Sequence, residues 1–304
     1  MSRRVRIAVT LGDPRGIGPE VTAAALGLGV DAEIIIVGAK EQAATFGAYE
    51  QVAVGSWSVS SAVARATARE AGLITGRAIE RAATMALAGE VDAIVTAPAE
   101  KHALHLAGYP WPGHTEWLAH LAGDVDVAMM LASDRLRVVL VTTHIPFRDV
   151  PLMLTTDRVV RTGEVTVRAL REGFGIATPR LAVCALNPHA GEHGLFGDEE
   201  ARILTPAAQR LGAAGPLPAD TVFVRAMRGE FDAVLAPYHD VGMTAIKVAS
   251  FGNAVNVTLG LPFVRTSPDH GTAMDIAGTG RADPASMHAA LDLAVRLARG
   301  SIAS

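Results

Sequence analysis

The sequence predicts an α/β fold built around a mostly parallel sheet. Short apolar runs alternate with longer segments of helical character over 304 residues, half of which are hydrophobic. Apolar runs such as residues 5–11 are typical of strands buried on both faces, whereas Thr156–Glu172 has the length of a helix. This alternation favours a three-layer α/β/α arrangement, and the length allows one large or two moderate domains.

Each expected element follows from its local pattern. Apolar runs predict strands at residues 5–11, 32–37, 92–96, 127–131, 136–141, 180–186, 233–235, 255–259 and 263–266. Helical spacing and start signals predict helices at residues 19–28, 75–88, 115–122, 156–172, 198–211 and 284–299. The strands at 127–131 and 136–141 are close enough for a hairpin, and residues 40–61 show little periodicity.

Composition narrows the class of protein. Lys and Arg total 27 against 31 Asp and Glu, so we expect neither a basic face nor a nucleic-acid partner. The single cysteine, Cys184, lies in an apolar run; this predicts a buried thiol and excludes a disulfide framework. The apolar stretch after the basic N-terminus ends at Asp13, too early for a signal peptide or membrane span. We therefore expect a cytoplasmic enzyme.

Three histidines each follow a predicted strand: His144, His189 and His239. Ligands bind at the carboxyl ends of parallel strands, so three imidazoles at this edge could hold one divalent metal with a position left open. Any one histidine here would more often be a structural or surface residue, and position at strand ends is the argument for a ligand. Asp240 is a candidate for orienting the His239 imidazole.

Other polar positions indicate an anionic ligand. Residues 112–116 look like a helix start, where Thr115 could cap the helix and the free N–H groups favour an anion. Arg265 ends a strand and precedes two hydroxyl residues, which suits a phosphate or carboxylate. An empty capped helix and a structural salt bridge are the respective alternatives. Neither the G-x-G-x-x-G nor the Walker pattern is present, so a Rossmann dinucleotide site is not expected.

Seven motifs resemble the 4-hydroxythreonine-4-phosphate dehydrogenase family of vitamin B6 biosynthesis over nearly the whole chain. They are Gly12-Asp-Pro-Arg-Gly-Ile-Gly-Pro-Glu20, Gly113-His-Thr-Glu116, Thr142-Thr-His-Ile-Pro146, Asn187-Pro-His-Ala-Gly-Glu192, Gly215-Pro-Leu-Pro-Ala-Asp-Thr221, Tyr238-His-Asp240, and Val255-Asn-Val-Thr-Leu-Gly-Leu-Pro262 leading to Arg265-Thr-Ser267 and Asp269-His-Gly271. Two departures stand out: Val241 replaces a common Gln, and residues 40–60 look shortened.

The resemblance implies a fold similar to isocitrate and isopropylmalate dehydrogenases. Two α/β subdomains would flank a cleft: residues 1–125 plus 268–304, and residues 126–267 with the metal and substrate residues. It also implies a homodimer with a shared active site, and NAD or NADP bound without the Rossmann fingerprint. In this family the residues matching His144, His189 and His239 bind a divalent metal, for which we expect Zn, Mg or Co. Those matching His114, Thr115, Lys247, Asn256 and Arg265 bind a phosphorylated hydroxy-acid substrate.

The implied reaction oxidises 4-phosphooxy-L-threonine at C3. The β-keto acid then loses CO2 to give 3-amino-2-oxopropyl phosphate, in pyridoxal 5'-phosphate biosynthesis. Lys247, Asp220, Asp240 and His270 are the candidates for charge stabilisation, proton transfer or orientation. Three alternatives stay open: a D-threonate or D-erythronate 4-phosphate dehydrogenase of the same family, a metallohydrolase, and a non-catalytic phosphometabolite-binding protein.

Overall fold

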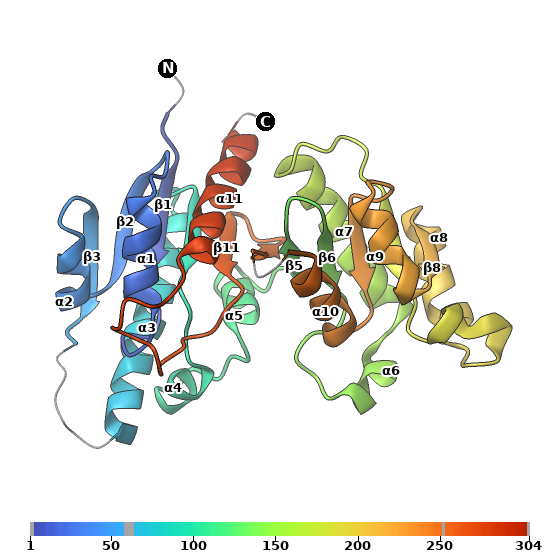
Figure 1. The fold of residues 1–304 in the computed structure, drawn as a ribbon, viewed down its shortest axis with the longest axis horizontal. Helices are drawn as coiled ribbons and strands as arrows, with labels where there is room; N and C mark the ends of the chain where they lie inside the picture. The colour runs from blue at the N-terminus through green and yellow to red at the C-terminus, as the bar shows by residue number, and fades with distance from the viewer. Residues whose placement is uncertain (1–2, 58–63, 251–252, 303–304) are drawn as a thin grey trace. The chain divides into compact units, whose positions relative to one another are not determined.

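The computed structural model describes residues 3–57, 64–250 and 253–302, and it divides into two compact units (Figure 1). The first unit comprises Met1–Val125 and Leu261–Ala303, and the second comprises Asp126–Gly260. The chain therefore returns to the first unit at Leu261, before the boundary that we expected at residue 268. The reason is that strand β11 (Val264–Pro268) pairs in parallel with β4 (Ala93–Thr96), which places Arg265 in the first unit and not, as expected, in the second.

The first unit contains a parallel sheet in the order β3-β2-β1-β4-β11. Strand β1 (Arg6–Thr10) pairs with β2 (Glu33–Ala39) on one side and with β4 on the other, so that Ile7 faces both Ile34 and Ala93. Strand β3 (Glu50–Gly55) pairs with β2 at the edge. Ile7, Ala8 and Val9 of β1 are fully buried, as expected of a parallel strand covered on both faces.

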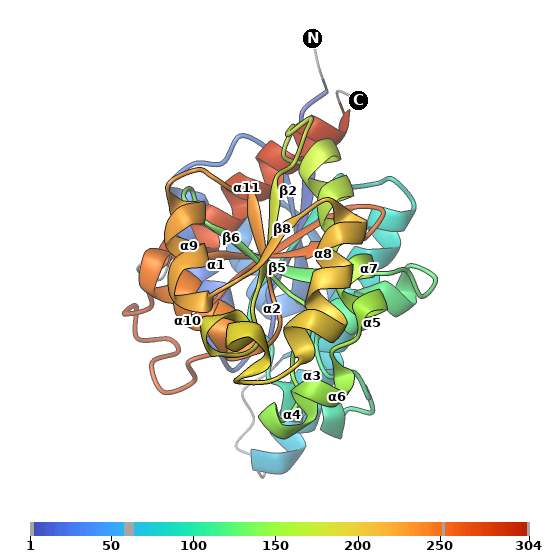
Figure 2. The ribbon, with the colours of Figure 1, turned by 90° about the vertical axis from the view of Figure 1, so that its right-hand side faces the viewer.

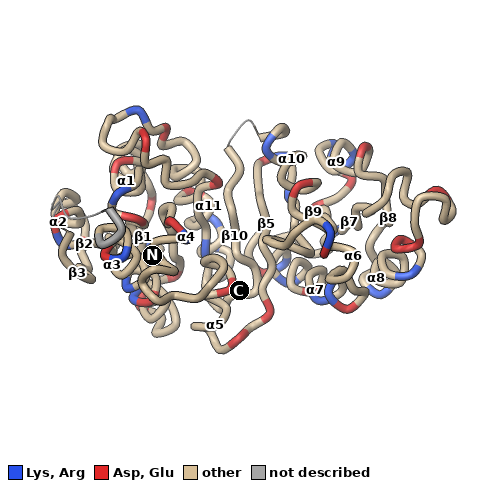
Figure 3. The backbone as a smooth tube through the Cα atoms, turned by 90° about the horizontal axis from the view of Figure 1, so that it is seen from below, with Lys and Arg blue, Asp and Glu red and all other residues tan. Residues whose placement is uncertain are grey.

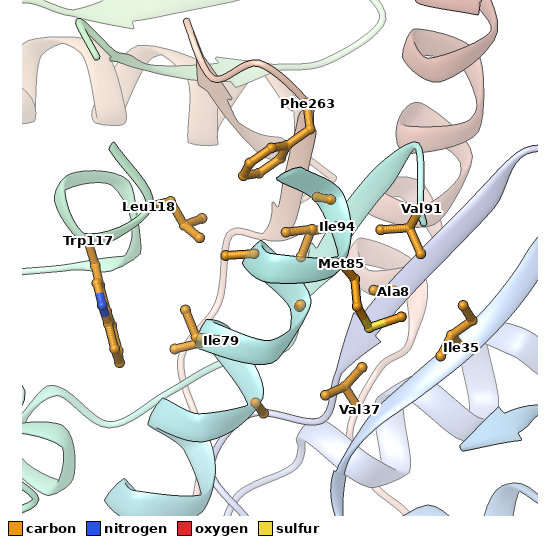
Figure 4. Close-up of a cluster of buried hydrophobic side chains, with 14 of the residues drawn as sticks. Ala8, Ile35, Val37, Ile79, Met85, Val91, Ile94, Trp117, Leu118 and Phe263 are labelled. Atoms are coloured by element: carbon orange, nitrogen blue, oxygen red, sulfur yellow. The ribbon is translucent and has the colours of Figure 1, made fainter. Parts of the chain in front are cut away.

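Helices cover both faces of this sheet. On one face, helix α3 (Ala64–Leu87) packs on β1, β2 and β4. Helices α4 (Lys101–Leu106) and α5 (His114–Leu121) contact α3 in turn. Helices α1 (Gly18–Gly27) and α11 (Ala285–Ile302) pack against each other, and α11 also contacts β4 and β11. Figure 4 shows the apolar cluster under α3, where Ile79, Ile94 and Leu118 meet. The short α2 (Lys40–Ala43) and the 3-10 turn η1 (Ala44–Phe46) precede β3.

The second unit contains strands in the order β10-β5-β6-β9-β7-β8. These are β10 (Val255–Leu259), β5 (Ala128–Ala132), β6 (Arg137–Leu140), β9 (Ala233–Ala236), β7 (Leu181–Cys184) and β8 (Ala214–Leu217). The predicted hairpin is confirmed, because β5 and β6 pair antiparallel. Strands β6, β9, β7 and β8 then run parallel to one another.

Helices also lie on both faces of the second sheet, with α9 (Ala219–Met227) and α10 (His239–Ser250) on one side and α7 (Thr156–Glu172) and α8 (Thr205–Leu211) on the other (Figure 2). Helix α7 has the predicted bounds, and the Thr155 hydroxyl caps it by accepting from the Arg158 N–H at 3.2 Å. The connecting turns are η2 (Phe147–Asp149), α6 (Val150–Met153), η3 (Pro188–Gly194) and the π-helical η4 (Glu200–Leu204).

Some elements differ from the sequence prediction. Strand β3 lies within residues 40–61, where no strand was expected, because an exposed edge strand needs no continuous apolar run; residues 58–61 lie outside the described part. Strand β8, helix α9 and helix α10 were not predicted either. The helix expected at residues 198–211 is divided, with the π-helical turn η4 preceding α8.

Two further predictions concern the whole chain. Cys184 is fully buried, and burial together with the charge of Glu200 raises the pKa of its thiol to about 12. Acidic and basic residues are interspersed along both units (Figure 3). Within the described residues, no helix combines the length and the apolar character that a membrane crossing requires.

Candidate functional site

The strands that precede the three histidines are neighbours in the second unit. Strand β9 lies between β6 and β7 and is parallel to both, with Val234 facing Val138 and Ala182. The carboxyl ends of the three strands therefore share one edge of the sheet. His144, His239 and His189 follow β6, β9 and β7 at this edge. The topology thus delivers three imidazoles from adjacent strands, although only the tertiary structure decides how close they come.

His144 and His239 come close together. Their ring centroids are 5.6 Å apart, and the two loops that carry them are joined where the Thr142 hydroxyl donates to the Pro237 carbonyl at 2.7 Å. Asp240 Oδ1 lies 2.7 Å from His239 Nδ1. A carboxylate is an acceptor, so this contact places the proton on Nδ1 and leaves Nε2 as the electron-pair donor.

A cavity of about 140 Å³ adjoins this histidine pair. Its lining consists of Thr143, His144, Ile145, Phe147, Val150, Tyr238, His239 and Asp240. The Phe147 and Tyr238 rings meet edge to face with centroids 5.3 Å apart, and burial raises the pKa of the Tyr238 hydroxyl. The cavity therefore combines aromatic walls with two imidazoles and a carboxylate.

His189 does not join the pair. It lies in η3 with its ring centroid 6.3 Å from that of Phe196. No three His, Cys, Asp or Glu side chains among the described residues are grouped so that they could hold a metal ion. Two imidazoles on one tetrahedral ion, each bound at about 2.1 Å, have ring centroids roughly 5 Å apart. The His144 and His239 rings are separated by a similar distance, and His189 follows a strand of the same sheet edge but lies apart from the pair.

The first unit holds a buried cation. Arg265 is 3% exposed, and its Nη2 donates to the Thr96 hydroxyl at 2.7 Å, between β11 and β4. Burial lowers the pKa of the guanidinium to about 10, with the charge of Glu116 opposing the shift. Arg265 therefore stays protonated at neutral pH, as an anion-binding residue must.

His114 lies at the first residue of α5, and Gly113 is the N-cap with no side-chain capping bond. The expectation that Thr115 caps this helix is wrong, because Thr115 lies within the first turn and is buried. Burial of the ring, followed by the positive charges of Arg265 and Lys101, lowers the pKa of His114 to about 3. The residue is partly exposed, yet its Nε2 has no solvent contact. His114 is consequently neutral at physiological pH.

Several predicted site residues carry buried polar atoms without a hydrogen-bond partner among the described residues. They are His114 Nε2 and His270 Nε2 in the first unit and Asn256 Oδ1 in the second. Nδ1 of His270 is 3.1 Å from the Gly271 carbonyl, so Nδ1 donates and Nε2 is left to accept. Buried polar groups in proteins nearly always have a partner. Such atoms at these positions fit residues that complete their hydrogen bonds with a ligand.

The remaining candidates are exposed. Asp220 lies in the first turn of α9, and Asp240 borders the histidine cavity. Lys247 lies on α10, eight residues after His239 and so about 12 Å further along the helix axis. Lys247 therefore does not line the cavity beside His144 and His239.

Sequence reasoning missed three contributors to these sites. Thr96 supplies the hydroxyl partner of Arg265, and its place at the end of a predicted strand was the available signal. Tyr238 lines the histidine cavity next to His239. Glu200 binds the start of the His189 loop, and nothing in the sequence near residue 200 indicates this long-range contact.

The sequence profile of a known family, the pyridoxal phosphate biosynthetic protein PdxA, matches residues 6–294. A 4-hydroxythreonine-4-phosphate dehydrogenase from Desulfosudis oleivorans is 43% identical, with 97% of this chain and 96% of that protein covered. The chain belongs to the PdxA family. The resemblance inferred from the motifs is thereby confirmed.

Other members of the PdxA family differ in their named activity. A D-threonate 4-phosphate dehydrogenase from Salmonella typhimurium is 44% identical, with 96% of this chain and 98% of that protein covered. A crystal structure of a 4-hydroxythreonine-4-phosphate dehydrogenase from Klebsiella pneumoniae matches with a TM-score of 0.83 at 40% identity, covering 98% of this chain and 99% of that one. This match confirms the predicted α/β fold class.

Proposed function

We propose that the protein is a divalent-metal-dependent dehydrogenase that oxidises 4-phosphooxy-L-threonine at C3, with NAD or NADP accepting the hydride. The β-keto acid product would lose CO2 to give 3-amino-2-oxopropyl phosphate, in the biosynthesis of pyridoxal 5'-phosphate. The observation that carries this proposal is the buried, protonated Arg265 near a neutral His114 in a chain of the PdxA family. Homodimer formation and a cytoplasmic location are part of the same proposal.

Phosphate recognition is assigned to the first unit. The Arg265 guanidinium is a fixed charge in a low-dielectric setting, where an anion gains most from it. Nε2 of neutral His114 offers one further hydrogen bond, and Thr115 lies in the first turn of α5. Lys247 and Asn256 are further proposed substrate residues and belong to the second unit, where Asn256 Oδ1 is a buried acceptor.

The metal is assigned to the second unit. His144 and His239 would hold Zn, Mg or Co together with His189, and Asp240 fixes the tautomer of His239. When bound, such an ion supplies Lewis-acid polarisation, which lowers the pKa of a ligated hydroxyl. Phe147 and Tyr238 line the cavity that adjoins this histidine pair. Lys247 does not line this cavity, so we assign it to charge stabilisation of the substrate, with Asp220 and His270 as orienting or relay groups.

A spectrophotometric assay tests the proposal. Metal-stripped protein is incubated with 4-phosphooxy-L-threonine and NAD or NADP, before and after addition of Zn²⁺, Mg²⁺ or Co²⁺. We expect nicotinamide reduction with restored metal only. Turnover that survives complete metal removal would refute the metal assignment, and substrate consumption without nicotinamide reduction would indicate a metallohydrolase. Binding without turnover under every condition would indicate a phosphometabolite-binding protein.

A second candidate substrate is D-threonate 4-phosphate or D-erythronate 4-phosphate. Its support is the Salmonella typhimurium relative, which is as similar in sequence as the relatives named for 4-hydroxythreonine 4-phosphate. The two substrate classes differ at C2, which carries an amino group in one and a hydroxyl in the other. Comparing kcat/KM for the amino and the hydroxy compounds in the same assay decides between them.

A further inference from the structure

A buried hydroxyl at the end of β4 holds the side chain of Arg265. Thr96 is the last residue of β4 and is 1% exposed, and its Oγ1 accepts the hydrogen bond from Arg265 Nη2 at 2.7 Å. Hydrogen bonds in which one partner is charged are stronger than those between neutral groups, and burial removes the competition from water. The contact therefore ties the cation of the proposed phosphate site to a fixed point of the sheet.

The register of the first sheet shows on which face the Arg265 side chain lies. Arg265 pairs with Ile94, and Ile94 shares its face of the sheet with Thr96, two residues further along β4. Ile94 and Leu118 of α5 belong to one apolar cluster (Figure 4), so this is the face that α5 covers. Thr266 alternates to the opposite face, where its hydroxyl donates to a carbonyl of α11 at 2.8 Å.

The hydrogen bond to Thr96 directs the guanidinium towards the edge of the sheet where ligands bind. Arg265 is paired with Ile94, yet its guanidinium reaches the last residue of β4. Open α/β sheets bind ligands at the carboxyl ends of their strands. The start of α5 lies close by, since burial and then the charge of Arg265 lower the pKa of His114, the first residue of that helix.

Thr96 is well suited to hold a long side chain in one direction. An arginine side chain has many rotamers and loses much of that freedom when it is fixed in one geometry. Threonine is stiff because it is branched at Cβ, and β4 is itself held by pairing with β1 on one side and β11 on the other. Binding groups need such neighbours, which lock their rotamers in the productive geometry.

We infer that Thr96 is a positioning residue for Arg265: its hydroxyl holds the guanidinium at the carboxyl edge of the first sheet, in the direction from which it binds the phosphate group of the substrate. This inference rests on the proposed function, in which Arg265 recognises phosphate. A hydroxyl that served stability alone would change the free energy of unfolding and leave phosphate affinity as it is.

The test uses the full-length protein and inorganic phosphate as the probe. The variants are Thr96→Val, which removes the hydroxyl, Thr96→Ser, which keeps it, and Arg265→Ala as the reference for loss of the cation. Thr22→Val is the matched control, because the Thr22 hydroxyl is also fully buried in the first unit but donates to the Gly18 carbonyl of its own helix at 2.7 Å. Should Thr96→Val fail to fold, Thr96→Cys replaces it, because a thiol is a weak acceptor.

Two measurements separate positioning from stability. Phosphate affinity is measured by calorimetric titration in phosphate-free buffer, and KM and kcat are measured with the phosphorylated substrate. We expect Thr96→Val to weaken phosphate binding about tenfold, and to raise KM by about the same factor while kcat stays within about twofold of wild type. Thr96→Ser should restore the phosphate affinity to within about twofold of wild type, and Thr22→Val should retain it.

The outcomes distinguish this inference from the proposed function. Wild-type phosphate affinity in Thr96→Val, alongside lost binding in Arg265→Ala, would overturn the inference and leave the phosphate assignment intact. Equal losses in Thr96→Val and Thr96→Ser, or in Thr22→Val, would also overturn it, because the Thr96 hydroxyl would then not be the cause. If Arg265→Ala binds phosphate as wild type does, the phosphate assignment itself is wrong, and the inference is rejected with it.

Discussion

At the scale of single residues, burial decides the chemistry of the first unit. Arg265 is buried, and Nε2 of His114 has no solvent contact; Arg265 retains its charge, whereas His114 loses its proton. Desolvation lowers the pKa of both groups, but the ordinary pKa of arginine is much higher than that of histidine. Arginine therefore stays charged after a shift that leaves histidine neutral. The charge of Arg265 and the neutrality of His114 therefore do not change with pH near neutrality.

Replacing Arg265 should impair substrate binding. Arg265→Ala removes a buried cation from the proposed phosphate site. We expect kcat/KM to fall by the equivalent of about 2–5 kcal/mol, mainly because KM rises. Steady-state kinetics with the phosphorylated substrate measure this loss. Arg225→Ala is the control, because Arg225 is a partly exposed residue of α9 that pairs with Glu230 outside the predicted sites. An unchanged KM in Arg265→Ala would refute the phosphate assignment.

His114 should make the protein less stable in acid. Its pKa is about 3 in the folded protein and 6.5 as the usual value, so below pH 6.5 the unfolded chain binds a proton that the folded chain rejects. Stability is therefore lost as pH falls from 6.5 towards 3. At pH 5 the loss is about 2 kcal/mol. Denaturant unfolding at pH 7.5 and pH 5 should show this difference in wild type and in His102→Gln, an exposed control, but not in His114→Gln.

At the scale of elements, close helix packing restricts which residues fit. Helix α3 approaches α4 at Gly72, where an added Cβ would lie 2.0 Å from the Ala103 carbonyl oxygen. The obstacle is backbone, which cannot rotate away as a side chain can. Strands β3 and β8 were not predicted from the sequence because both are edge strands without a long apolar run. Strand β3 ends at Gly55, and β8 contains Gly215 and Pro216.

Gly72→Ala should therefore destabilise the protein, whereas Gly27→Ala should not. We expect a loss of about 1–3 kcal/mol at Gly72 from overpacking. Gly27 ends α1 with open space around its Cβ position, so the same change there should stabilise by about 0.4–1 kcal/mol. Free energies of unfolding from urea titration measure both. Equal effects at the two glycines would contradict the close approach of α3 and α4.

At the scale of the whole molecule, the first unit is built from both ends of the chain. Residues 261–303 return to it after the second unit, adding β11 to the sheet and α11 to one face. Leu291, Ala294 and Met287 of α11 are fully buried. The first unit is therefore complete only when the C-terminal helix has docked.

Leu291→Ala tests this dependence. Removing a fully buried leucine side chain should cost about 2–5 kcal/mol, because the cavity that remains is only partly filled by relaxation. Arg296→Ala on the exposed face of the same helix should change stability by less than about 0.5 kcal/mol. Thermal unfolding monitored by circular dichroism compares the two. Similar melting temperatures would mean that α11 contributes little to the first unit.

The sequence by itself determined the fold class, the family and the strands that precede the three histidines. The fold class and the strands follow from local apolar runs, and the family follows from seven motifs that occur in the family's order. The shared position of the histidines follows from the rule that parallel strands end at one edge of a sheet. The tertiary structure decided which groups meet: it paired β11 with β4, which moved Arg265 to the first unit, and it brought His144 to His239 but not to His189. It also revealed Glu200 beneath the His189 loop. Such contacts depend on loop conformation and burial across residues distant in sequence, which local patterns do not encode.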